Sequence, residues 1–264
     1  MKYIDSSVLD AEQTVAYWME QTVASGVKEF RCQTGYFTLE GTSPVLSSIS
    51  KCASAGAQVS MLLGSNDGST LASHISFLAG KLNVPLANVS LGIVRYEDAL
   101  FHPKVYVFHR SDGSITAYVG SANMTGTGVS GRNVEAGLIL DSLNGDDEAI
   151  IEQISGTIDD WFADPPESLS IIDGPDAIEA LLNEGDLAVR PAPRLSLHSP
   201  SGVSFEVKIA CIRALDKDFL PQAAPAVAQT AGSGRIRPRS RCFLAQGRRF
   251  SAQRTDLSSR FRSV

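Results

Sequence analysis

The sequence predicts an α/β protein, with a mixed β-sheet flanked by helices and a small C-terminal appendage. Three observations support this prediction. Apolar runs of strand length alternate with amphipathic runs of helix length over residues 29–96, which is typical of crossover units. A Ser-Asp-Gly turn at 111–113 joins two further apolar runs as an antiparallel hairpin. The 264 residues, 43% hydrophobic and 20% charged, have an ordinary globular composition.

The first half of the chain alternates predicted helices and strands. Within residues 8–25, Val15, Trp18 and Met19 recur at helical spacing and Gly26 follows as a stop signal. Runs rich in aromatic, β-branched and aliphatic residues predict strands between the helices. The remaining predictions for this half are helices at 43–56 and 69–83 and strands at 29–39, 57–65 and 89–96.

The next segment predicts three strands and a long helix. The strands are expected at 104–110, 114–120 and 135–141. In the first of them, Val105 and Val107 alternate with Tyr106 and Phe108, which predicts a strand buried on both faces. The helix at 146–163 is amphipathic, with an apolar face formed by Ile150, Ile151, Ile154, Ile158 and Trp161.

Composition divides the chain into three predicted regions. Residues 1–165 form the main domain, and residues 166–218 form a small region with a helix at 175–184 and two possible strands. Residues 219–264 hold nine arginines, one acidic residue (Asp256) and no lysine. Because the whole chain carries a net charge of −6, the first 218 residues carry about −14. We predict that the arginine-rich tail is disordered; the alternative is that it binds phosphate backbones.

Cysteine spacing indicates whether the chain binds a metal, and hydropathy indicates in which compartment it is expected. Cys32, Cys52, Cys211 and Cys242 are scattered and show no metal-binding spacing, so we expect reduced thiols and no metal. No apolar run approaches the roughly 20 residues of a membrane span, and the N-terminus lacks the apolar core of a secretory signal. The sequence therefore predicts a cytoplasmic protein with no membrane partner and no cofactor.

Polar groups gather at the ends of the predicted hairpin strands. His102 and Lys104 stand two residues apart at the start of an apolar run, and we expect them to share one face of a strand. Ser121 and Asn123 follow the neighbouring strand in the run Gly-Ser-Ala-Asn, and Glu135 begins the next strand. Each of these residues alone has an ordinary structural explanation as a partnered histidine, a strand charge or a turn former. Together they combine a nucleophile, a cation, hydrogen-bond donors and a carboxylate, which is the chemistry needed to bind and attack a phosphate.

The order His-x-Lys, Gly-Ser-x-Asn and Glu resembles the signature of the phospholipase D superfamily. The resemblance implies a phospholipase D-like catalytic domain over residues 1–165. It also implies that His102 attacks phosphorus to form a phosphohistidine and that no metal is required. Lys104 and Asn123 would bind the phosphoryl oxygens, Ser121 would complete the motif, and Glu135 would support the histidine. The motif-bearing part covers about residues 100–141.

Two departures from the fuller motif refine this resemblance. The aspartate expected five residues after the lysine is replaced by His109, which makes the chain more similar to metal-independent restriction endonucleases of the NgoFVII and BfiI type than to the lipid enzymes. The chain also holds one His-x-Lys, whereas the superfamily uses two histidines. We therefore expect a homodimer in which two His102 side chains face one another across a shared cleft and titrate as a coupled pair.

Three functions remain open on the sequence. The first is a metal-independent endonuclease of restriction type that cuts DNA as a homodimer. The second is a phospholipase D-type lipid phosphodiesterase or phosphatidyltransferase, although no basic amphipathic helix suited to a lipid surface is seen. The third is a non-catalytic DNA-binding module of the same fold. Residues 166–218 would then form a partial DNA-recognition domain. The sequence does not indicate a cleavage sequence.

Overall fold

A computed structural model describes residues 1–191, 194–198 and 204–208. The predicted arginine-rich tail at 219–264 lies outside the described residues, and so do Cys211 and Cys242. The two strands β9 (Arg194–His198) and β10 (Ser204–Lys208) form an antiparallel pair of their own, at the positions where the sequence suggested two strands.

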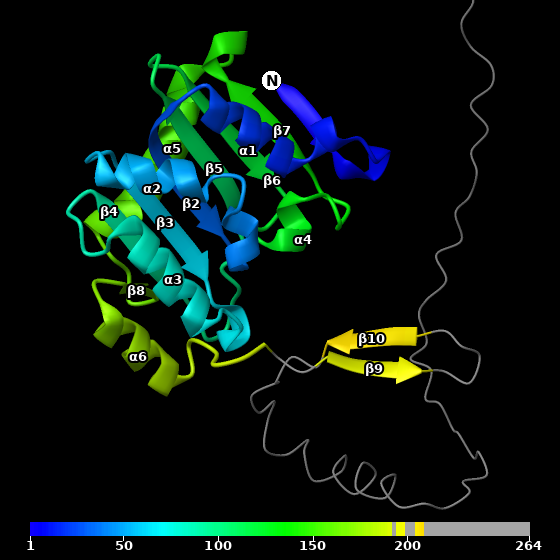
Figure 1. Ribbon diagram of the computed structural model, residues 1–264, viewed down its shortest axis with the longest axis vertical. Helices are drawn as coiled ribbons and strands as arrows, with labels where there is room; N and C mark the ends of the chain where they lie inside the picture. Colours follow the sequence, from blue (N-terminus) through cyan, green and yellow to red (C-terminus); the bar gives the residue numbers. More distant parts are fainter. Residues whose placement is uncertain (192–193, 199–203, 209–264) are drawn as a thin grey trace, which may run out of the picture. The chain divides into compact units, whose positions relative to one another are not determined.

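The main unit is built on one mixed sheet of eight strands within the described residues (Figure 1). Across the sheet the order is β1-β7-β6-β5-β2-β3-β4-β8. The central strands β2, β3 and β4 are parallel, and every other neighbouring pair is antiparallel. The strands are β1 (Lys2–Asp5), β2 (Val27–Thr34), β3 (Val59–Gly64), β4 (Val89–Val94), β5 (Lys104–Arg110), β6 (Ile115–Gly120), β7 (Ala136–Asp141) and β8 (Leu169–Ile171).

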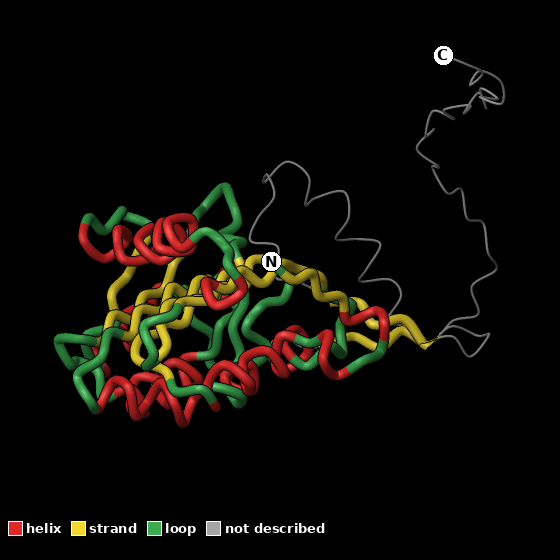
Figure 2. Tube along the Cα trace, turned by 90° about the horizontal axis from the view of Figure 1, so that it is seen from above, coloured by secondary structure: helices red, strands yellow, loops and turns green. Residues whose placement is uncertain are grey.

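Helices lie on both sides of this sheet, as the edge-on view in Figure 2 shows. The long helix α5 packs against β2, β3, β5 and β6 on one face. The other helices contribute to the core on the opposite face, with α6 packed on α3. Their bounds are α1 (Val15–Ala24), α2 (Leu46–Ser54), α3 (Ala72–Leu82), α4 (Gly126–Val129), α5 (Glu148–Ala163) and α6 (Pro175–Glu184).

Strand β5 is buried on both faces, as the sequence predicted. Tyr106 and Phe108 belong to the larger core, beneath α1 and α2, while Val105 and Val107 belong to the core under α5. Burying both faces explains why the strand reads as a continuous apolar run and not as a polar-apolar alternation. The predicted mixed sheet with flanking helices is therefore confirmed.

Several boundaries differ from the prediction, each for a local reason. The first helix starts at Val15 and not near residue 8, because Thr14 caps it by accepting the Tyr17 N–H. Strand β2 ends at Thr34, because Gly35 and the residues after it turn away to contact other loops. Ile150 is 50% exposed and so does not belong to the buried face of α5. Strands β1 and β8 and the short helix α4 were not predicted.

Residues after 165 continue the main unit. Strand β8 pairs with β4 through Leu169, Ser170 and Ile171, and α6 has the bounds predicted for a helix at 175–184. The division of the chain into functional regions at residues 165 and 218 stays a prediction. Among the described residues, no helix is both long and apolar enough to cross a membrane.

Candidate active site

The predicted site residues gather at one edge of the sheet. This edge holds the carboxyl ends of β2, β3 and β4. Because β5 runs antiparallel to β2, its first residue, Lys104, pairs with the last residue of β2, Thr34. Strand β6 ends at the same edge, and Glu135 directly precedes β7, whose Gly137 pairs with Gly120. The topology therefore brings together residues that are up to 33 positions apart, from His102 to Glu135.

His102 lies in the loop just before β5 and its side chain is exposed. The prediction that His102 and Lys104 share a strand face is therefore wrong, because the strand begins only at Lys104. The His102 and Tyr36 rings form a T-shaped pair with a centroid distance of 5.9 Å. Its backbone lies against Gly35, where an added Cβ would stand only 2.9 Å from the His102 Cα. The histidine is thus held closely at its backbone while its ring remains accessible to a substrate.

Lys104 is 6% exposed, which is unusual for a lysine. Its Nζ donates a hydrogen bond of 2.7 Å to the His102 carbonyl oxygen. Burial lowers the pKa of Lys104, and the nearby carboxylate of Glu135 opposes that shift. Within the described residues, no carboxylate forms an ion pair with this ammonium. A buried cation without an acidic partner is suited to receive an anion.

The neighbouring charge also acts on the histidine. Burial lowers the pKa of His102, and the positive charge of Lys104 lowers it further. A lowered pKa increases the neutral fraction of the imidazole near pH 7, and only the neutral ring has a free nitrogen lone pair. The local electrostatics therefore favour the nucleophilic form.

Ser121 and Glu135 are hydrogen-bonded to each other. The Ser121 hydroxyl donates to Glu135 Oε2 and accepts the Ala136 N–H at 3.0 Å. Ser6 fixes the Glu135 backbone, accepting its N–H at 2.8 Å and donating its own N–H to the Glu135 carbonyl at 2.9 Å. The structure thus places the glutamate beside the serine and near the lysine. No hydrogen bond to His102 is formed by Glu135 within the described residues, and the predicted role of this carboxylate in supporting the histidine stays a prediction.

Asn123 is oriented by the backbone of the loop that follows β2. Its Oδ1 accepts the Tyr36 N–H at 3.0 Å. The adjacent Met124 N–H donates to Thr34 Oγ1 at 2.9 Å, and the Met124 carbonyl accepts the Thr38 N–H at 3.0 Å. With Oδ1 engaged in this way, the Nδ2 group has no partner among the described residues and remains available as a donor.

Two buried tyrosines, Tyr106 and Tyr118, hold the Gly-Ser-Ala-Asn turn through hydrogen bonds to its backbone. Sequence analysis did not identify them. The Tyr106 and Tyr118 rings stack at 5.7 Å. Tyr106 Oη donates to the Ala122 carbonyl at 2.7 Å, and Tyr118 Oη accepts the Ala122 N–H at 3.2 Å. Burial raises the pKa of both hydroxyls, so they remain neutral. The sequence did contain a signal for this pair. A hairpin with its turn at 111–113 places Tyr106 directly opposite Tyr118, which is the register that the structure has.

His109 occupies the position where the fuller motif has aspartate, and it lies away from the site. It is near the far end of β5, where its Nε2 lies 3.1 Å from Ser155 Oγ on α5. Glu152 on the same helix is 4.0 Å from its Nδ1. A further histidine, His74, accepts the Leu39 N–H at its Nδ1. Of the histidines discussed, only His102 stands next to the buried lysine.

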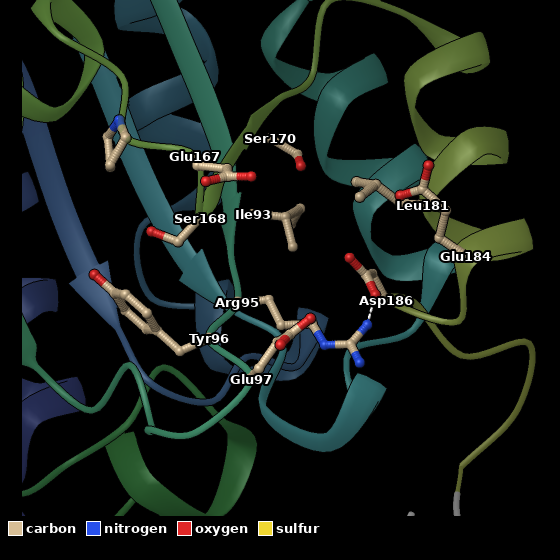
Figure 3. A pocket seen from close by; sticks show the side chains of 11 residues that line it. Ile93, Arg95, Tyr96, Glu97, Glu167, Ser168, Ser170, Leu181, Glu184 and Asp186 are labelled. Carbon is tan, nitrogen blue, oxygen red and sulfur yellow. Dashed lines mark ion pairs between the residues drawn. The ribbon is translucent and has the colours of Figure 1, made fainter.

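A separate pocket of about 800 Å³ lies between β4, β8 and α6 (Figure 3). Arg95 is paired with Asp186 there, and Glu97, Glu167 and Glu184 also line the walls. This excess of carboxylates opposes an anionic substrate. In the part of the chain that the structure describes, no cluster of three or more His, Cys, Asp or Glu residues is arranged to hold a metal ion.

One protein-family model and two solved structures are similar to this chain. A sequence model of the N-terminal PLD domain of the NgoFVII restriction endonuclease matches residues 13–159, more than half of the chain. A search of curated proteins gives no match. NucT from Helicobacter pylori is similar in structure at 15% identity and a TM-score of 0.40, over 64% of this chain and 98% of NucT. Phosphatidylserine synthase from Haemophilus influenzae Rd KW20 is similar at 13% identity and a TM-score of 0.41, over 63% of this chain and 41% of the synthase.

The mixed sheet and the family match together define a phospholipase D-like domain. More specifically, the chain belongs to the NgoFVII restriction endonuclease family, through its N-terminal PLD domain. A PLD-like nuclease of restriction type is the class of enzyme that this family represents.

Proposed function

We propose that the protein is a metal-independent endonuclease that cuts DNA through a phosphohistidine intermediate on His102. The observation that carries this proposal is the exposed His102 imidazole on a residue whose backbone carbonyl is bound by the buried Lys104 ammonium, in a chain of the NgoFVII family. A nucleophile beside a desolvated cation suits attack on an anionic phosphodiester, whose charge otherwise repels a nucleophile.

In the first step, the lone pair of a neutral His102 nitrogen forms a bond to phosphorus. The bond between phosphorus and the leaving oxygen of the sugar breaks, and that oxygen takes a proton from a second, protonated imidazole. In the second step, water attacks the phosphohistidine and the phosphorus–nitrogen bond breaks. The second imidazole, now neutral, takes the proton from that water. General acid–base steps of this kind contribute roughly 10²–10⁴ each in rate.

The other site residues have separate roles in this mechanism. The Lys104 ammonium neutralises the nonbridging phosphoryl oxygens, and the Asn123 Nδ2 group donates to them. Ser121 and Glu135 form a hydrogen-bonded pair beside the lysine, and we assign to them the task of holding the polar edge of the site in place. Electrostatic groups fixed before the reaction avoid the cost of reorganisation.

The second imidazole comes, on this proposal, from a second copy of the same chain. The sequence has one His-x-Lys. His109 and His74 are both engaged in contacts elsewhere. A two-fold axis beside His102 would bring two identical histidines to one phosphate, one neutral and one protonated, and add two Lys104 charges.

The direct test is plasmid cleavage in excess chelator with wild type, His102→Ala and the matched variant His109→Ala. We expect wild type and His109→Ala to cut, and His102→Ala to lose at least about 10⁴ in rate, since loss of a nucleophile removes the covalent route. Label from a phosphorus-labelled substrate should be retained on wild type as an acid-labile adduct. Cleavage that requires Mg²⁺, or that survives in His102→Ala, would refute the mechanism.

Two further measurements separate this proposal from its alternatives. Hydrolysis of phosphatidylcholine vesicles in place of DNA would favour a lipid phosphodiesterase, and DNA binding without any cleavage would favour a non-catalytic module. Light scattering on the eluting protein should give the mass of a dimer. A monomer that retains full activity would eliminate the shared site.

A further inference from the structure

The turn after β3 holds a buried asparagine that contacts the loop of the candidate nucleophile. Asn66 is 3% exposed. Its Nδ2 donates to the carbonyls of Gly35 at 2.7 Å and Phe101 at 3.0 Å. Its Oδ1 accepts the Phe101 N–H at 3.1 Å. The side-chain amide therefore pairs with the Phe101 backbone in both directions, as a neighbouring strand would, at a place where no strand is present.

These bonds fix the backbone on both sides of His102. Asn66 holds Phe101, the residue before it. The Gly35 N–H donates to the Pro103 carbonyl, the residue after it, at 2.9 Å. Since Asn66 also binds the Gly35 carbonyl, one amide group ties together the two segments that surround the histidine. The Phe101 ring is anchored separately, edge-on to Trp161 at 5.4 Å.

We propose that Asn66 is a positioning residue that sets the location of the His102 imidazole. This inference rests on the proposed function for its catalytic consequence, while its structural part can be tested alone. His102 precedes β5, and apart from the Gly35–Pro103 bond no backbone–backbone hydrogen bond among the described residues holds residues 101–103. The amide of Asn66 supplies that constraint. A displacement of about 1 Å at a reacting group can cost about 10²-fold in rate.

A control is needed to separate the positioning of His102 from the general structural effect of losing a buried asparagine that bonds to two backbone carbonyls. Asn88 provides that comparison, because its Nδ2 also donates to two backbone carbonyls, Ala53 at 2.9 Å and Ala57 at 2.6 Å. It lies just before β4, at the opposite edge of the sheet. Replacing Asn88 therefore removes similar bonds without affecting the loop of His102.

The experiment compares Asn66→Ala, Asn66→Asp and Asn88→Ala with wild type. One measurement is kcat and KM for bis(p-nitrophenyl) phosphate in excess chelator. The other is the NMR spectrum of histidine-labelled protein, with the His102 signals assigned from His102→Ala. Asn66→Asp is isosteric and keeps the acceptor for Phe101, but it loses both donors, so it tests the same contact if Asn66→Ala does not fold.

We expect both Asn66 variants to lower kcat about tenfold to 100-fold while KM changes by less than about threefold. The His102 ring signals should shift and broaden, and those of His109 should stay in place. Asn88→Ala should resemble wild type in both measurements. An Asn66 variant with kcat within about twofold of wild type, or with unchanged His102 signals, would overturn the inference. If wild type itself does not cleave phosphodiesters, the proposed function fails, and the NMR comparison still decides the role of Asn66.

Discussion

A histidine and a cationic residue lie at or beside each end of strand β5, and the two ends differ in how these groups are partnered. At its start, the His102 ring is exposed, and the Lys104 ammonium bonds to a backbone carbonyl. At its end, His109 lies within hydrogen-bonding distance of Ser155, and Arg110 forms a bidentate ion pair with Asp141 at 3.0 and 2.6 Å. A histidine and a cationic residue thus stabilise the fold where partners within the chain bind them. Where no acidic partner is supplied, they are available to a substrate.

Apart from loss of the nucleophile itself, the largest effects should come from the two cations of this strand, one on the cleavage rate and the other on stability. Lys104→Met should lower the cleavage rate about 10²–10³-fold, as expected for loss of one fixed group that stabilises developing charge, with little loss of stability. Arg110→Met should leave the partly buried Asp141 carboxylate without its ion-pair partner and cost about 3 kcal/mol in the free energy of unfolding, with the rate per folded molecule unchanged. Denaturant titration and cleavage kinetics measure both. If both variants lost activity and stability together, the distinction between the two ends would be wrong.

Substitution of two glycines, Gly35 beside His102 and Gly80 in α3, should have smaller effects on the cleavage rate and on stability. In Gly35→Ala, the new Cβ would stand 2.7 Å from the Phe101 carbonyl oxygen and 3.1 Å from the His102 ring, so the histidine must shift and the rate should fall about tenfold to 100-fold. Gly80, in α3, has no heavy atom within 4 Å of an added Cβ. Gly80→Ala should therefore stabilise the helix by up to about 1 kcal/mol. Equal activity of the two variants would show that Gly35 does not control the position of His102.

The smallest effect concerns pH and His109. Burial, followed by the charge of Arg31, lowers the pKa of His109 in the folded chain. The unfolded chain then binds the proton more readily, so stability is full above the ordinary histidine pKa of about 6.5 and decreases as pH falls through the folded value. His109→Asn should flatten this decline between about pH 7 and pH 5, as measured by urea midpoints. His102 is more exposed and should contribute less to the pH dependence of stability. If the decline were flattened in His102→Ala and not in His109→Asn, its assignment to His109 would be wrong.

Sequence analysis could predict the parts of the fold and site that depend on local pattern. The continuous apolar run predicted the bounds of β5. The order and spacing of His102, Lys104, Ser121, Asn123 and Glu135 selected residues that the topology brings to one edge of the sheet. Whether these five residues act as proposed is left to the experiments above. The position of His102 outside the strand was not predictable, because it depends on hydrogen bonds from Gly35 and Asn66, far away in the sequence. Sequence analysis did not single out Asn66, because the Phe101 backbone to which it bonds belongs to a loop that begins after β4.

The antiparallel hairpin of β5 and β6 has one practical consequence. Its turn, at Asp112 and Gly113, lies at the opposite end of both strands from Lys104 and Gly120, roughly 20 Å away for strands of six to seven residues. Gly113 has a positive φ of 90° and no neighbour within 4 Å of an added Cβ. A fluorophore or an epitope inserted at this turn would therefore lie far from the candidate site and should leave its geometry undisturbed.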